Sequence, residues 1–90
     1  MIKLRLFASL REIAGSKEVE VEGSALSICQ ALEQFAERFG ERARQCLFDK
    51  EGRIFPSVLL LVNGEATGSG GETQVKSGDV VSVLLPTAGG

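Results

Sequence analysis

The sequence predicts an α+β domain in which a mixed sheet of about five strands carries one main helix on one face. Three observations lead to this class. Several short segments alternate apolar and polar residues with the period of two that strands require, and one segment repeats apolar residues at helical spacing. The 90 residues leave room for only one core. We expect a domain over residues 1–85 and a flexible C-terminal tail over residues 86–90.

The N-terminal part of the sequence predicts a hairpin of two half-buried strands. Residues 2–7 alternate apolar and basic side chains and place Phe7 on the outer side of the sheet. Residues 8–15 read as a turn-like connection. Residues 18–22 alternate glutamate and valine, which is typical of a strand with one polar face.

The main helix is predicted to begin after Ser27. Ser27 and Gln30 have the spacing of a capping box, in which each side chain binds the backbone N–H of the other residue. Gly40 stands where a glycine would end the helix, and residues 41–48 predict a short second helix. One apolar stripe runs along the main helix, made of Ile28, Ala31, Leu32, Phe35, Ala36 and Phe39.

The C-terminal half predicts the remaining strands. Residues 58–62 are all apolar, as in a strand inside a sheet, and Asn63-Gly64 is a strong signal for a type I′ hairpin turn. Residues 67–71 read as a flexible connection, and residues 76–79 as a turn into a last strand over residues 80–85. A hairpin, a helix and later strands favour a grasp arrangement, with the first and last strands parallel at the sheet centre.

Composition excludes several classes of function. The sequence has no histidine, so catalytic triads and zinc sites that contain histidine are excluded. Cys29 and Cys46 are too few for a four-cysteine metal site, and we expect no bound metal. A net charge of −2 gives no basis for binding nucleic acid or an anionic membrane. Without a visible targeting segment or membrane span, we expect a cytoplasmic protein.

Alternation along the strands predicts an exposed apolar surface on the outer face of the sheet. Phe7, Leu59, Leu61 and Leu84 would lie there and could dock a partner. Two alternatives remain open: Phe55 or other loop residues cover this surface, or the strand register differs by one residue and exchanges the faces.

The sequence closes on Gly89-Gly90. Two glycines can enter a slot too narrow for side chains, and they leave the carboxylate of Gly90 accessible as a reacting group. The alternative is an inert end made of small residues.

Several motifs together resemble the ubiquitin-like β-grasp proteins of the sulfur-carrier and modifier group. This group includes the small subunit of molybdopterin synthase, the thiamine sulfur carrier and the small archaeal modifier proteins, and the length around residues 44–56 is most similar to the last of these. The resemblance spans the whole sequence. It rests on residues 2–8, 10–15, 62–65, 77–81 and 85–90.

The resemblance implies a carrier or modifier and not an enzyme. An E1-like adenylating enzyme would use ATP to activate the Gly90 carboxylate, so the chain itself would bind no cofactor. The activated glycine would then be joined to lysines of target proteins, or become a thiocarboxylate for molybdopterin synthesis or tRNA thiolation. The large subunit of molybdopterin synthase would be a further partner. The alternative is a non-covalent binding module that docks through its outer sheet face.

Overall fold

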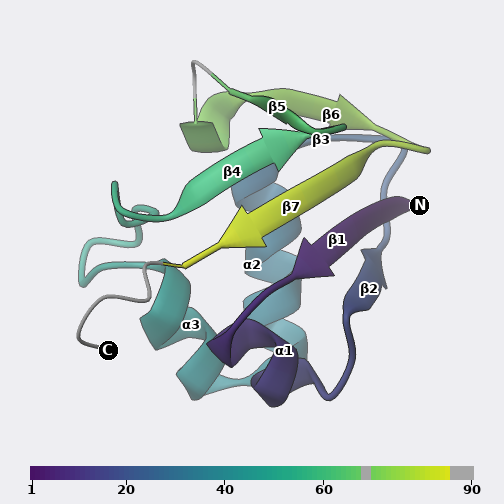
Figure 1. The fold of residues 1–90 in the computed structure, drawn as a ribbon. Coiled ribbons are helices and arrows are strands. Elements are labelled where there is room, and N and C mark those ends of the chain that lie inside the picture. The colour runs from purple at the N-terminus through teal and green to yellow at the C-terminus, as the bar shows by residue number, and fades with distance from the viewer. Residues whose placement is uncertain (68–69, 86–90) are drawn as a thin grey trace.

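The computed structural model describes residues 1–67 and 70–85. Within them, a five-stranded mixed sheet is packed on one side by helices (Figure 1). The helices are α1 (Ser9–Ala14), α2 (Ile28–Phe39) and α3 (Glu41–Leu47), with a 3₁₀ turn, η1, at Gly70–Glu72. The strands are β1 (Ile2–Leu6), β2 (Glu18–Val21), β3 (Ala25–Ser27), β4 (Leu59–Val62), β5 (Glu65–Ala66), β6 (Gln74–Lys76) and β7 (Val80–Leu84).

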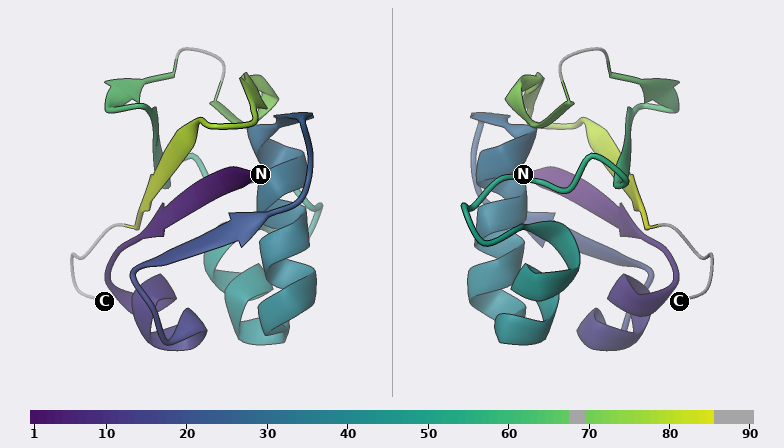
Figure 2. Two further views of the ribbon diagram at one scale, coloured as in Figure 1. Left: turned by 90° about the vertical axis from the view of Figure 1, so that its right-hand side faces the viewer. Right: turned by 90° about the vertical axis from the view of Figure 1, so that its left-hand side faces the viewer.

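The main sheet has the strand order β2-β1-β7-β4-β5. β1 and β7 are parallel at its centre, as the sequence predicts, and the other neighbours are antiparallel. A two-stranded sheet of β3 and β6, which the sequence did not predict, lies at the start of α2 (Figure 1). Edge-on, α2 runs along one side of the sheet, and the described helices leave the other side uncovered (Figure 2).

The core lies between α2 and the inner face of the sheet. Leu4 and Leu6 of β1 face Val81 and Val83 of β7 in register, and all four are fully buried. The predicted helical stripe packs against them, with Phe35 almost fully buried and its ring centroid 4.8 Å from that of Phe39. The alternation of β1 and β7 therefore fixes which side chains turn to the opposite, outer face.

The ends of α2 are set by the predicted local signals. The hydroxyl of Ser27 accepts from the backbone N–H of Gln30 at 3.1 Å, and the Gln30 side chain accepts from the N–H of Ser27 at 2.9 Å. Gly40 follows the helix with φ of 92°, a conformation that favours glycine. Both predictions are confirmed.

One connection differs from the prediction. Residues 8–15 contain the helix α1 and not a simple turn. Ala8, at φ of 53°, precedes it without a side-chain cap, and only Leu10 of its six residues is buried. Such a short helix has too few apolar positions to give a helical period. The connection predicted over residues 67–71 lies partly outside the described residues, and Gly70 and Gly71 belong to η1.

Candidate functional site

The outer face of the sheet carries the apolar surface that alternation predicted. Leu59 lies opposite Leu84, and Leu61 lies opposite Ser82, where β4 pairs with β7. Because Val83 and Leu60 are buried in the core, the alternate residues Leu59, Leu61 and Leu84 point to the outer face. We call these three residues the apolar patch, and they lie on the face of the sheet that alternation predicted.

The members of the apolar patch differ in exposure. Leu59 is the most exposed of the three, with 49% of its surface open to solvent, whereas Leu61 and Leu84 are half-buried. Phe55, which the sequence left as a candidate cover, packs against the core. The Leu59 side chain is therefore available for contact with another molecule.

Phe7 follows β1 directly and is half-buried. The guanidinium carbon of Arg11, from α1, lies 5.7 Å from the centroid of its ring, which is the distance of a cation–π contact. Through this contact, the positively charged side chain of Arg11 lies next to Phe7, on a surface that the sequence predicted to be apolar. The alternation of β1 did not predict this contact, because Arg11 lies beyond the end of the strand.

The other half of the outer face is charged. Lys3 and Arg5 of β1 lie opposite Glu20 and Glu18 of β2. Arg5 holds the Glu18 carboxylate with its Nη2 at 3.1 Å and its Nε at 3.2 Å, and Lys3 Nζ reaches the same carboxylate at 3.7 Å. Ser82 of β7 separates this charged half from Leu61.

The start of β7 is held by a network that we call the clasp, formed by Asn63 and Asp79. Asn63 Nδ2 donates to Asp79 Oδ1 at 3.1 Å, and Asn63 Oδ1 accepts from the N–H of Val80 at 3.0 Å. Asp79 Oδ2 accepts from the N–H of Lys76 at 2.9 Å. Chiefly this backbone hydrogen bond, followed by that from Asn63, lowers the pKa of Asp79 below its ordinary value.

Asn63 also forms the predicted hairpin turn between β4 and β5. Its φ is 52° and that of Gly64 is 89°, so both turn residues have the positive φ of a type I′ turn. The prediction from Asn63-Gly64 is confirmed, and the same asparagine fixes the strand next to it.

The end of β7 lies beside the end of β1. Leu6 is the partner of Val83, and Leu85, the last described residue, packs against the core. In Figure 1 this end of the sheet adjoins α1. Gly89 and Gly90, the predicted reacting residues, lie outside the described residues. Leu59 and Leu84 are paired at this same end, so the exposed part of the apolar patch lies where β7 finishes.

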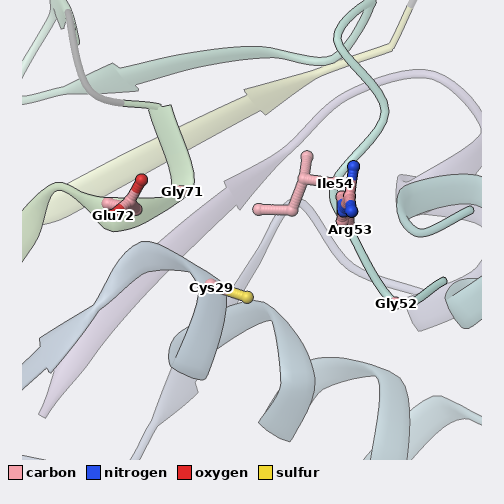
Figure 3. Close-up of a pocket in the computed structure, with 6 residues that line it drawn as sticks. All are labelled: Cys29, Gly52, Arg53, Ile54, Gly71 and Glu72. Carbon is pink, nitrogen blue, oxygen red and sulfur yellow. The ribbon is translucent and has the colours of Figure 1, made fainter.

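A separate hollow of about 310 Å³ lies between α2, η1 and the segment after α3 (Figure 3). The Cys29 sulfur points toward Ile54 in this hollow. Burial, and secondarily the nearby Glu33 carboxylate, raises the pKa of the Cys29 thiol. A protonated thiol is a poor nucleophile, so Cys29 acts here as a small packing residue.

The described part of the chain holds neither a metal-binding cluster nor a membrane-spanning helix. No group of three or more histidine, cysteine or acidic side chains within residues 1–67 and 70–85 could hold a metal ion. Among residues 1–67 and 70–85, the helices lack the length and the apolar character of a membrane span.

Comparison with known proteins identifies the family. The model of the ThiS family matches residues 4–90. The chain is 34% identical to small archaeal modifier protein 3 of Haloferax volcanii, over 99% of this chain and 98% of that protein. It is 31% identical, over the same shares, to a protein of Archaeoglobus fulgidus described as a sulfur carrier.

Solved structures agree with this identification. The solution structure of small archaeal modifier protein 1 from Methanosarcina acetivorans matches with a TM-score of 0.81 and 28% identity, covering 99% of this chain and 95% of that one. The observed sheet order, the parallel central strands and the packed helix are therefore those of the ubiquitin-like β-grasp fold. The chain belongs to the ThiS family, among relatives that are sulfur-carrier and small archaeal modifier proteins.

Proposed function

We propose that this protein is a carrier or modifier whose C-terminal carboxylate, on Gly90, is activated by an E1-like adenylating enzyme. The carboxylate would attack the α-phosphate of ATP and release pyrophosphate, which leaves an acyl-adenylate. A carboxylate is a poor electrophile, and this step supplies AMP as a leaving group. The chain would contribute the reacting group and a docking surface, while ATP and the catalytic groups belong to the enzyme.

The observation that carries the proposal is the position of the apolar patch at the end of β7. Leu59 is 49% exposed and lies opposite Leu84, one residue before the last described residue, Leu85. An enzyme that covers Leu59 and Leu84 would thereby be close to the segment that follows β7. Phe7 follows Leu6, the register partner of Val83 in β7, and would extend the docking surface. A few residues near the centre of an interface, where water is excluded, supply most of its binding energy.

The proposal allows two reactions of the adenylate. Attack on its carbonyl by a sulfur nucleophile releases AMP and leads to a thiocarboxylate, a sulfur donor for molybdopterin synthesis or tRNA thiolation. Attack by a lysine amine releases AMP and forms an isopeptide bond to a target protein. The first fate would add the large subunit of molybdopterin synthase as a partner, and either would take place in the cytoplasm.

The test is adenylate formation by the cognate activating enzyme, measured as ATP–pyrophosphate exchange. Deletion of Gly90 should abolish the exchange. The deletion moves the terminal carboxylate back to Gly89, one residue short of the reacting position, whereas Gly90→Ala keeps the carboxylate at position 90. The alanine variant should weaken the exchange without abolishing it, which provides the matched control. Full exchange after the deletion would contradict the requirement for Gly90, and absence of exchange with the unaltered chain would favour a non-covalent binding module. Intact-mass analysis for replacement of oxygen by sulfur, and a search for glycine remnants on lysines, then separate the two fates.

A further inference from the structure

Three cations line a hollow on the β2 side of β1, whereas the apolar patch lies on β7 and β4. The hollow has a volume of about 380 Å³ and is lined by Arg5, Arg11, Lys17 and Glu18. We call Arg5, Arg11 and Lys17 the basic cluster. They come from β1, from α1 and from the turn before β2, so no sequence periodicity links them.

The basic cluster is fixed to the end of β1 by backbone contacts of Leu6. The N–H of Leu6 donates to the carbonyl of Lys17 at 2.8 Å, and Arg11 Nη2 donates to the carbonyl of Leu6 at 3.3 Å. Leu6 is in turn the register partner of Val83. The cluster therefore lies at the end of the sheet where β7 finishes, as the apolar patch does.

The charges of the basic cluster are only partly compensated. Glu18, its one acidic neighbour in the hollow, is already shared by Arg5 and Lys3. Among the described residues, no carboxylate lies within 4 Å of Arg11 or Lys17. A positive surface thus persists in a protein whose net charge is −2. Such a local charge attracts an acidic partner even though the whole protein is acidic.

We propose that the basic cluster receives an acidic side chain of the activating enzyme, and this inference rests on the proposed function. Contact between Arg11 and Phe7 makes the hollow continuous with the docking surface. An apolar centre with a charged rim is the usual composition of a protein interface, and the rim sets the rate and orientation of association. Glu18 in the lining disfavours a multiply charged phosphate more than a single carboxylate.

The test is charge reversal with Arg11→Glu and Lys17→Glu together. The matched control is Arg42→Glu with Lys50→Glu, two exposed cations on and after α3 that undergo the same change in charge. We expect the KM of the activating enzyme for the Arg11/Lys17 variant to rise about tenfold or more at about 0.05 M salt, with kcat unchanged. The difference should largely disappear at about 0.5 M salt, where exposed charges are screened. The control should change KM less than about twofold.

Other outcomes would overturn the inference. These are an unchanged KM, an equal effect of the control, or an effect that salt does not reduce. If wild type binds inorganic phosphate and the reversal removes that binding without raising KM, the cluster is a small-anion site. Arg11→Gln with Lys17→Gln repeats the test with less repulsion if the reversed variant does not fold. If deletion of Gly90 abolishes exchange while the charge-reversal variant keeps the wild-type KM, this inference is refuted and the proposed function stands.

Discussion

The two ends of β7 differ in their surroundings: polar groups at its start bind one another within the protein, whereas side chains at its end face solvent. At its start, Asn63 and Asp79 satisfy the backbone N–H groups of Val80 and Lys76 and bind each other. At its end, Leu59 turns half of its surface to solvent. Close to this end, Arg11 donates one N–H to the carbonyl of Leu6, and among the described residues no carboxylate lies within 4 Å of its guanidinium group.

This difference separates stability from recognition along one strand. Groups whose hydrogen bonds are made inside the protein contribute to the free energy of unfolding and have little left for a partner. Exposed leucine and uncompensated cations contribute little to folding and are available for binding. Substitutions at the start of β7 should therefore change stability, and those at its end should change recognition.

The largest effect is expected for Asn63→Ala. The substitution removes both side-chain hydrogen bonds of Asn63 and places alanine at a φ of 52°. With about 1 kcal/mol for each bond and about 1 kcal/mol for the left-handed conformation, unfolding should become easier by about 3 kcal/mol. Urea unfolding measures this. Asn63→Gly tolerates the conformation and should lose less, and equal losses in the two variants would exclude a conformational contribution.

A smaller effect, of the opposite kind, is expected for Leu59→Ser. Because Leu59 is 49% exposed and loses only part of the burial of a leucine, unfolding should become easier by only about 1 kcal/mol. Removal of an apolar contact from the interface should raise the KM for adenylation about tenfold. Steady-state pyrophosphate exchange and urea unfolding on the same preparation check both values. A KM equal to that of wild type would show that docking uses another surface.

The smallest effect is expected from acid titration of the clasp. The folded pKa of Asp79 lies below its unfolded value, which is about 3.9. The unfolded chain therefore takes up this proton first as pH falls, so the stabilisation by Asp79 is complete above about pH 5 and is lost through the lower folded pKa.

Comparison with Asp79→Asn isolates this contribution. The stability difference between wild type and Asp79→Asn should be largest near neutral pH and should shrink below about pH 4. Asp49 is the matched control, since hydrogen bonds led by that from the N–H of Arg53 also lower its pKa, at a site far from the clasp in sequence. A difference that stays constant down to about pH 2 would show that the charge of Asp79 is not what stabilises the fold.

Much of the fold could be predicted because its signals are local. The capping box at Ser27, the hairpin at Asn63-Gly64 and the alternation of β1 each depend on neighbouring residues, and each is confirmed. The small sheet of β3 and β6 was missed because strands of three residues are too short to establish a period. The six-residue helix α1 was missed for the same reason.

The candidate site divides in the same way. Leu59, Leu61 and Leu84 lie on regular strands, so alternation placed them on one face. The basic cluster could not be predicted, since Arg11 and Lys17 are brought together by hydrogen bonds to Leu6 across two irregular connections. The residues of the tail remain a prediction from the sequence and the resemblance.

The parallel pairing of β1 with β7 has a consequence for how the protein folds. Lys3 is the partner of Val80, so the central contact of the sheet joins the beginning of the sequence to its end. Closing so long a loop is entropically costly, and proteins rich in such contacts fold more slowly than proteins with local contacts. During synthesis, the sheet lacks its middle strand until β7 has been made. An activating enzyme that recognises the outer face of this sheet would therefore select finished, folded chains over nascent ones.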